Sequence, residues 1–341
     1  MSKNFLILYF LELKIITHIL YGNFIWLMSR IGFIGCHKIS WYCLKKIAEL
    51  SKKYGDELVV VFNLEKEKGI KYSSYVDFSS LQKDFNFNLI HVTKVSDSEN
   101  LEILKNAKLD VLFIIGWHQI VPQTVLDSSK INLGIHSSLL PKDRGSSPIN
   151  WQIIRDEHQG GATLFHLTVG VDAGNIVDQE PYSITEIDNV STVYEKATLS
   201  SLNLLEKNWN DIHLSNLTSL KQDENKITLN KQRRPNDGLI DWSKSSKDCY
   251  NWIRALTSPY PGAFTFYKNK KIYLWDSKIS NHNSTSPGQI IEIGERIVVS
   301  TGNGSIELLS LQVEDEPTCN ANLFSKSYDL EKNNFFNDTL G

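Results

Sequence analysis

Short apolar runs alternate with amphipathic stretches between residues 30 and 209. Such runs predict buried strands, and the clearest are 30–35, 58–63, 111–115 and 130–135. Between them, residues 40–54 and 100–108 carry apolar side chains at helical spacing. The alternation predicts an α/β domain of Rossmann-like type, in which a parallel sheet is flanked by helices.

The same patterning extends the first domain to residue 209. Residues 147–156 and 192–208 predict helices, and the apolar run 162–169 predicts a strand between them. Residues 210–231 are polar and lose this periodicity, which is typical of a linker. We therefore expect one domain over residues 28–209, followed by a linker over residues 210–231.

A second unit with a different pattern begins at residue 232. It opens with a helical stretch, 243–256, in which Ser245 and Asp248 fit a capping box. Short apolar runs separated by turn residues follow, at 263–267, 271–276, 288–293, 296–300 and 305–311. Such a series predicts a small OB-like β-barrel over residues 232–312. Residues 313–341 are polar, and we expect a loosely ordered tail there.

Residues 1–27 form an apolar amino-terminal extension that fits neither a membrane span nor a signal peptide. Glu12 and Lys14 lie within the apolar run, and charges at mid-span cost roughly 2.5–3.5 kcal/mol each. A small-residue cleavage site is missing. We therefore predict no membrane span, and our hypothesis is that Met28 is the working start of the natural protein. An amino-terminal sequence that begins at Met1 would contradict it.

Composition and charge narrow the functional classes. At 341 residues the chain suits two domains, and its net charge of −3 gives no overall electrostatic case for nucleic-acid binding. The four cysteines are scattered, without a CxxC pair or a cysteine–histidine metal spacing. We therefore expect no metal and a reducing, cytoplasmic location. The turn after residues 33–35 lacks the GxGxxG fingerprint, so no dinucleotide site is predicted.

Candidate chemistry is concentrated in residues 131–151 and 170–176. His136 ends a predicted strand beside two serines and a loop, where an imidazole is well placed to move a proton near neutral pH. A lone histidine is more often a satisfied structural residue. Asp172, however, lies in a loop of small residues that can bring its carboxylate against the ring. We assign His136 to proton movement, and Asp172 to holding the ring and favouring its protonated form.

These stretches carry a family resemblance. The sequence HSSLLPKDRG, followed by Pro148 and Trp151 and then by DAGNI, resembles the signature of the folate-dependent formyltransferases. The resemblance implies that His136 and Asp172 are catalytic and that N10-formyltetrahydrofolate is the formyl donor. It also implies an asparagine two residues before the histidine, where this chain has Gly134.

The resemblance also implies donor and substrate contacts. One wall of the folate site would be His118, Gln119 and Ile120, and the other wall would be Thr168, Val169, Gly170, Val171 and Asp172. Without the resemblance, His118 is interpreted as a packing residue. Arg144 would meet a substrate phosphate or shape the loop. Family members often carry a second arginine two residues later, where this chain has Ser146.

Gly134 leaves the oxyanion stabiliser unassigned. Side chains two residues apart on a strand share a face at about 6.6 Å, whereas four residues separate them by about 13 Å. Asn132 would therefore need a bulge or bend to reach the same oxyanion. The protonated ring of His136, a backbone amide and Gln119 are further candidates. We favour a bend at Gly134 that brings Asn132 or a backbone amide into place, and weakened activity is the alternative.

The second unit resembles one branch of this family more narrowly. The sequences RRP, DW, WIRAL and PYPGAF resemble formyltransferases of nucleotide-linked amino sugars, including the formylating half of the polymyxin-resistance enzyme. The expected function is formyl transfer to the amine of a nucleotide sugar, for a surface polysaccharide such as lipopolysaccharide O-antigen. Methionyl-tRNA formyltransferase and a catalytically weakened folate-binding homologue stay open as alternatives, and tRNA is a partner only under the first of these. A homodimer paired through strands of the second unit is also expected.

Overall fold

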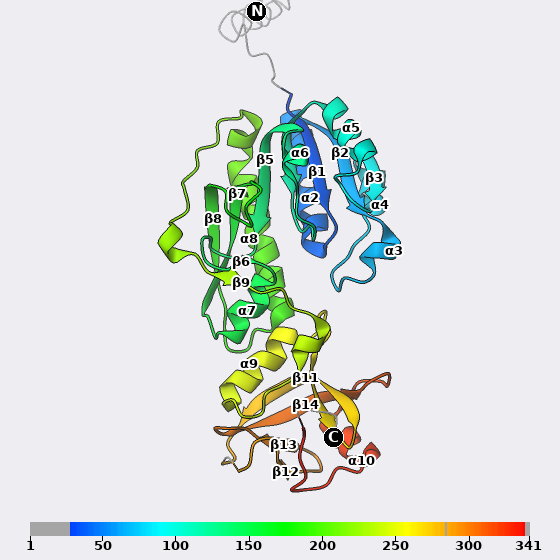
Figure 1. Cartoon of the computed structure of the whole chain (residues 1–341), viewed down its shortest axis with the longest axis vertical. Helices are drawn as coiled ribbons and strands as arrows, with labels where there is room; N and C mark the ends of the chain where they lie inside the picture. The colour runs from blue at the N-terminus through cyan, green and yellow to red at the C-terminus, as the bar shows by residue number, and fades with distance from the viewer. Residues whose placement is uncertain (1–27, 284, 338–341) are drawn as a thin grey trace, which may run out of the picture.

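The chain folds into two parts joined end to end, an α/β domain and a smaller antiparallel-sheet domain (Figure 1). The computed structural model describes residues 28–283 and 285–337, so the amino-terminal extension and the hypothesis about Met1 lie outside the described residues. Within this described part, no helix combines the length and the apolar character needed to cross a membrane.

The α/β domain is built on a seven-stranded sheet in the order β3-β2-β1-β4-β5-β7-β8. Its strands are β1 Arg30–Gly35, β2 Glu57–Leu64, β3 Asn88–Val92, β4 Leu109–Ile114, β5 Ser129–His136, β7 Gln159–His166 and β8 Ile176–Ser183. Strands β1 to β5 are parallel, which confirms the predicted Rossmann-like architecture. The sheet is not parallel throughout, because β7 and β8 run antiparallel to their neighbours. Ligands of open α/β sheets bind at the carboxyl ends of the parallel strands, and β5 ends there at His136.

Helices cover both faces of this sheet. They are α2 Lys38–Tyr54, α3 Lys66–Gly69, α4 Ser79–Asp84, α5 Ser98–Ala107, α6 Gln123–Leu126, α7 Pro148–Ile154 and α8 Val190–His213. The apolar sides of α2 and α8 share one core with the sheet, in which Trp209 stacks on Phe113 with ring centroids 6.0 Å apart. Leu104 of α5 and Val125 of α6 belong to the core on the other face. The sheet is therefore buried on both sides, as its near-continuous apolar strands require.

The two domains share a third hydrophobic core. The helix α9 (Ser246–Leu256) lies between the two sheets and packs on α7 (Figure 1). Arg254 of α9 is buried and donates from Nη1 to the backbone carbonyl of Asp188 at 2.6 Å. Ser245 caps α9 in a reciprocal box with Asp248, as the sequence predicts. Buried contacts thus fix how the second domain is attached.

The second domain is a curled antiparallel sheet, which agrees with the predicted OB-like half of the fold. Its strands are β10 Ala263–Tyr267, β11 Lys270–Ser280, β12 Ile290–Glu292, β13 Ile297–Ser300, β14 Ser305–Val313 and β15 Cys319–Asn320. They pair in the order β10-β11-β14-β13-β12, and β15 adds to β14.

The carboxy-terminal segment differs from the loose tail expected from its polarity. It contains the helix α10 (Ala321–Ser327), and both Phe324 and Phe336 are buried in the core of the second domain. Asn337 exchanges two backbone hydrogen bonds with Phe266 of β10, and Asn334 accepts one from the first residue of β12. The segment therefore fills the gap between the two outer strands of the curled sheet.

Candidate active site

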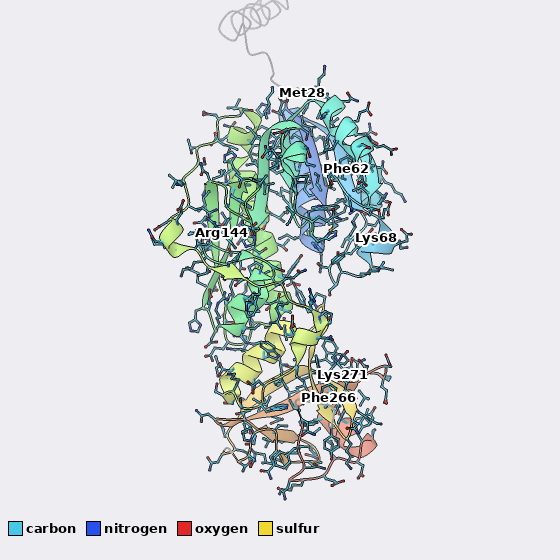
Figure 2. The ribbon with its side chains drawn as sticks, viewed as in Figure 1. Met28, Phe62, Lys68, Arg144, Phe266 and Lys271 are labelled. Carbon is cyan, nitrogen blue, oxygen red and sulfur yellow. The ribbon has the colours of Figure 1, made fainter. Side chains whose placement is uncertain are left out.

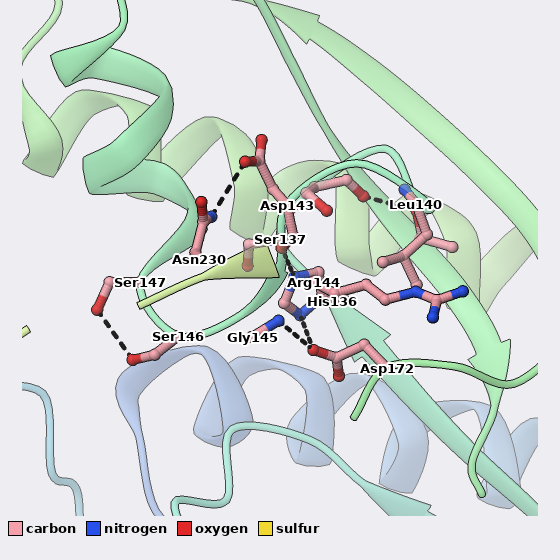
Figure 3. Close-up of polar contacts among 12 residues, drawn as sticks. His136, Ser137, Leu140, Asp143, Arg144, Gly145, Ser146, Ser147, Asp172 and Asn230 are labelled. Atoms are coloured by element: carbon pink, nitrogen blue, oxygen red, sulfur yellow. Dashed lines mark hydrogen bonds and ion pairs between the residues drawn. The ribbon is translucent and has the colours of Figure 1, made fainter. Parts of the chain in front are cut away.

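His136 is the last residue of β5, and its side chain is largely buried. Its Nε2 lies 2.7 Å from the backbone carbonyl oxygen of Asp143. A carbonyl oxygen can only accept, so Nε2 carries the ring proton. The neutral ring keeps its lone pair on Nδ1, the nitrogen that faces Asp172 (Figure 3). Nδ1 is therefore the atom of His136 that can take up a proton.

Asp172 lies in the loop between β7 and β8 and has a left-handed backbone conformation, with φ of +47°. Its Oδ2 accepts the backbone N–H of Gly145 at 2.7 Å and lies 3.6 Å from His136 Nδ1. The structure thus brings together the two residues that the sequence singled out. Their separation is that of an ion pair rather than of a hydrogen bond. Asp143 therefore holds the ring, a role that the sequence had assigned to Asp172.

The loop after His136 is anchored by side chains of the neighbouring strands β7 and β8. Thr163 Oγ1 donates to the carbonyl of Ser138 at 2.6 Å and accepts the N–H of Leu140 at 3.1 Å. Gln179 Nε2 donates to the carbonyl of Leu140 at 2.8 Å. Sequence reasoning missed both anchors, because they bond to backbone atoms that no residue pattern reveals.

Asp143 is itself held in place by its buried carboxylate. Its Oδ1 accepts from the guanidinium of Arg155. The same atom accepts from Asn230 Nδ2 at 3.0 Å (Figure 3). Its backbone N–H donates to Thr228 Oγ1 at 2.8 Å. These bonds set the position of the carbonyl that fixes the tautomer of His136.

Thr228 and Asn230 belong to the segment 210–231, which the sequence presented as a linker. Two residues of this segment, Leu229–Asn230, form β9 and pair with β6 (Arg144–Gly145). Leu220 exchanges two backbone hydrogen bonds with Ile176, the first residue of β8. The segment is therefore part of the site and not only a connection between domains.

Arg144, the predicted substrate-binding residue, donates from Nε and Nη2 to Oε1 of Gln222 at 3.0 and 2.8 Å. Gln222 is 5% exposed. The guanidinium therefore shapes the loop, one of the two roles expected of it (Figure 2 shows its place in the molecule). Its contact with a substrate phosphate stays a prediction.

Gly134 lies in regular strand geometry. It pairs with Ile114 of β4 and with Phe165 of β7, without a register shift at this position. A β-carbon on Gly134 would lie 2.8 Å from Cδ2 of Leu167 and 3.0 Å from the Phe165 ring. Apolar side chains therefore fill the space that an asparagine side chain would need.

The favoured interpretation is that a bend at Gly134 brings Asn132 or a backbone amide to the oxyanion; the structure contradicts the bend and the role of Asn132, and a backbone amide stays a prediction. Asn132 Nδ2 donates to the carbonyl of Leu126 at 2.8 Å, and its Oδ1 accepts from Ser129 Oγ at 2.9 Å. Both bonds hold its amide toward the end of α6 and the first residue of β5. Gln119 is directed elsewhere too, because its Nε2 donates to the carbonyl of Thr93 at 2.7 Å.

The two predicted folate-binding segments follow β4 and β7, and both contain exposed aliphatic side chains. The ring of His118 packs on Tyr72 with centroids 4.4 Å apart, and burial lowers the pKa of His118, so the ring is neutral near pH 7. Ile120, Val169 and Val171 are 83%, 59% and 53% exposed. Exposed aliphatic side chains on site loops suit contact with an apolar ring of a ligand.

Other routes to catalysis find little support in residues 28–283 and 285–337. Within these residues, no group of three or more histidine, cysteine or acidic side chains is arranged to hold a metal ion. Burial raises the pKa of the Cys36 and Cys43 thiols to about 12, so neither is a thiolate near neutral pH. The described residues hold other histidine–carboxylate pairs, such as His213 with Asp56 at 2.7 Å, but the His136–Asp172 pair is the one at the carboxyl end of β5, where ligands of open α/β sheets bind.

Fold and site together define a two-domain α/β enzyme with a histidine–aspartate centre, and comparison with known proteins gives the family. Residues 39–206 match the family model described as Formyl transferase, and residues 233–329 match Formyl transferase, C-terminal domain. The chain is 30% identical over 292 residues to the methionyl-tRNA formyltransferase of Streptococcus agalactiae serotype III, covering 85% of this chain and 93% of that protein. The protein belongs to the formyltransferase family.

Two further similarities concern other members. The chain is 35% identical over 244 residues to the bifunctional polymyxin resistance protein ArnA of Wigglesworthia glossinidia brevipalpis, covering 70% of this chain and only 37% of that relative. Its fold is similar to that of an N-formyltransferase from Helicobacter canadensis solved with folinic acid and dTDP-3-aminofucose. That likeness has a TM-score of 0.65 at 20% identity and covers 82% of this chain and 99% of the other.

Proposed function

We propose that this protein transfers a formyl group from N10-formyltetrahydrofolate to the amine of a nucleotide-linked amino sugar. The observation that carries the proposal is the His136–Asp172 pair, in which a proton-accepting Nδ1 faces a carboxylate at 3.6 Å. Formyl transfer needs such a pair, because a neutral amine that attacks the formyl carbon must then lose a proton. Membership of the formyltransferase family supports the same reaction class.

His136 performs the proton step. As the amine nitrogen forms its bond to the formyl carbon, Nδ1 accepts the proton that this nitrogen releases. Collapse of the tetrahedral intermediate breaks the bond from the formyl carbon to N10, and Nδ1 returns the proton to N10 of the departing tetrahydrofolate. Asp172 stabilises the imidazolium between these steps through its opposite charge. The backbone carbonyl of Asp143 keeps Nε2 protonated throughout, so the neutral ring stays in one tautomer and Nδ1 alone gains and loses the proton.

The donor would bind between the two loops that carry exposed apolar residues. Ile120 lies on the loop after β4, and Val169 and Val171 lie on the loop that delivers Asp172. The folinic acid in the Helicobacter canadensis relative supports a folate donor for this fold. Because Asp172 shares its loop with Val169 and Val171, donor binding against these valines would bring the formyl carbon close to His136.

The charges of the second domain favour a nucleotide sugar over tRNA as the acceptor. Several of its cations are paired: Lys271 lies 3.2 Å from Glu314, and Glu307 lies 3.1 Å from Lys278 and 2.9 Å from Arg296. Binding to a polynucleotide backbone relies on cations that are free to replace its counterions. The dTDP-3-aminofucose in the Helicobacter canadensis structure also supports a nucleotide sugar as the acceptor. Initiator methionyl-tRNA stays the alternative acceptor, since the similarity to a methionyl-tRNA formyltransferase spans most of the chain.

One observation favours a second candidate function, a folate-binding homologue with weakened turnover. Leu167 fills the space beside Gly134, and the amide of Asn132 is bonded elsewhere. Removing one oxyanion donor costs roughly 10²–10³-fold in rate in other enzymes. A slow enzyme is therefore consistent with the same residues, whereas complete inactivity is not required by them.

The cellular compartment of the protein stays a prediction. The four cysteines are free, which is consistent with the cytoplasmic location expected from the sequence. A homodimer stays a prediction as well, and analytical ultracentrifugation of the full chain would test it.

An acceptor panel tests the proposed function. The full chain is incubated with N10-formyltetrahydrofolate and, separately, with dTDP-linked and UDP-linked amino sugars and with charged initiator tRNA. Mass spectrometry then reports which acceptor gains a formyl group. The proposal expects an N-formylated nucleotide sugar. Formylation of tRNA alone would establish the alternative, and donor binding without transfer to any acceptor would favour the weakened homologue.

A further inference from the structure

Gln222 joins three parts of the candidate active site through four hydrogen bonds. Its Oε1 accepts both donors of the Arg144 fork. Its Nε2 donates at 2.7 Å to the carbonyl of Asp172 and at 2.7 Å to the carbonyl of Gly174. The side chain is 5% exposed, so every one of these bonds is made away from bulk water. Such a fully bonded buried amide has one orientation, which it imposes on its partners.

Gln222 bonds to the Asp172 loop at two positions whose backbone conformation is strained or tightly packed. Asp172 has φ of +47°, a conformation that costs a residue with a side chain free energy and therefore needs support from its surroundings. Two residues later the loop passes so close to β7 that a β-carbon on Gly174 would lie 1.6 Å from the carbonyl oxygen of His166. Gln222 bonds to the carbonyls at both of these positions, and so it fixes the turn that aims the carboxylate.

We propose that Gln222 is a positioning residue for formyl transfer: it holds the Asp172 carboxylate opposite His136 and ties that position to Arg144. The kinetic part of this proposal rests on the proposed function. Gln222 acts through Asp172 and does not itself touch the reacting atoms. Arg144 is bonded to the same amide. A ligand that binds the Arg144 guanidinium would therefore also change the strength of the hydrogen bonds from Gln222 to the Asp172 loop.

One consequence can be measured without any activity. The N–H of Gly145 is bonded to Asp172 Oδ2 at 2.7 Å, so its hydrogen exchange reports where the carboxylate lies. The substitution Gln222→Met nearly keeps the volume of the side chain and removes all four hydrogen bonds of its amide. We expect exchange of the Gly145 amide, followed by NMR, to accelerate about tenfold, the equivalent of one lost hydrogen bond. Asp172→Ala gives the reference for complete loss of that bond.

Gln312→Met is the matched control. Gln312 also has both amide atoms bonded, accepting from Trp275 Nε1 at 2.8 Å and donating to the carbonyl of Glu316 at 2.6 Å, and it lies in the second domain. Its substitution removes a comparable set of bonds far from His136. It should leave both the exchange of Gly145 and the turnover unchanged.

Kinetics then separate positioning from simple stability. Gln222→Met should lower kcat by about 10- to 100-fold, as expected for a misplaced catalytic group, with little change in KM for the donor. Gln222→Glu still accepts from Arg144, but its carboxylate cannot donate to the two carbonyls. Protonation restores one donor, so the rate of this variant relative to the unchanged protein should rise as the pH falls from about 8 to about 6.

Two results would overturn the proposal. One is a Gly145 exchange rate in Gln222→Met equal to that in Gln312→Met. The other is an unchanged kcat in Gln222→Met despite faster exchange at Gly145, which would mean that the position held by Gln222 does not matter for transfer. If the unchanged protein transfers no formyl group at all, the proposed function fails, and the exchange measurement alone still decides whether Gln222 positions Asp172.

Discussion

Leu167 covers Gly134 so closely that a β-carbon on the glycine would lie 2.8 Å from the leucine Cδ2 atom. The family resemblance implies an asparagine at this position, and here an apolar contact lies in its place on the His136 face of β5. An asparagine at position 134 can therefore act as an oxyanion donor only if the side chain of Leu167 is also made smaller.

Gly134→Asn alone should not raise the rate of formyl transfer. The new side chain meets Leu167, and overpacking of this kind costs about 1–3 kcal/mol of stability. Combined with Leu167→Ala, the asparagine gains room to donate to the oxyanion, and the rate should rise by up to about 10²-fold. Turnover and urea unfolding of the two single variants and the double variant check this. An equal gain in the Gly134→Asn single variant would show that Leu167 is no obstacle.

Asn132→Ala should leave turnover unchanged and lower stability. Its amide bonds to the carbonyl of Leu126 and to Ser129, not to the site, and a lost hydrogen bond of this kind costs about 1 kcal/mol. Urea unfolding and kcat, measured on the same preparation, separate the two effects. A large fall in kcat would revive Asn132 as the oxyanion stabiliser.

Asp172→Asn should slow transfer by about 10- to 100-fold, which corresponds to roughly 1.4–2.7 kcal/mol in the barrier. The amide keeps the size of the carboxylate but loses the charge that stabilises the imidazolium. Donor affinity, measured by fluorescence titration, should change little. Asp178→Asn, which alters a carboxylate of β8 that is paired with Lys207, is the control. A wild-type rate in Asp172→Asn would leave Asp172 as a loop residue only.

His37 makes stability depend on pH. Burial, and in second place the charge of His118, lower the pKa of His37 from 6.5 to about 4 in the folded protein. Between these values the unfolded chain binds the proton more readily. The contribution of the neutral His37 ring to the free energy of unfolding is therefore complete above about pH 6.5. It is lost as the pH falls toward 4, by an amount of the order of 3 kcal/mol.

Urea unfolding between pH 4 and pH 7 tests this expectation. His37→Gln should flatten the acid side of the stability curve, and the exposed His158→Gln should not. An identical pH dependence in the unchanged protein and in His37→Gln would contradict the account.

Regular periodicity made much of the fold predictable, and its absence explains the omissions. Strand β1 and strand β10 have the predicted bounds, because each is a short and mostly apolar run. Strand β3 was missed, since Asn88–Val92 is short and includes exposed polar residues. The antiparallel direction of β7 was missed too, because a fully buried strand has the same pattern in either direction.

The site was predictable only where one residue carries the chemistry. His136 and Asp172 stand out by type and by the motif around them. Gln222 did not, because it lies in a polar segment without periodicity and its partners are backbone carbonyls about fifty residues away. Phe324 and Phe336 illustrate the same limit in the core, because a few aromatic residues in a polar segment gave no sign of burial.

The most direct test of the central claim is the rate of formyl transfer by His136→Ala. It is measured in a single turnover with N10-formyltetrahydrofolate bound and the accepting amino sugar added, and the exposed His158→Ala serves as the control. The account predicts a loss of roughly 10²–10⁴-fold with donor affinity nearly unchanged, because the ring acts on the proton and not on the folate. A rate in His136→Ala close to that of the unchanged protein would contradict the account.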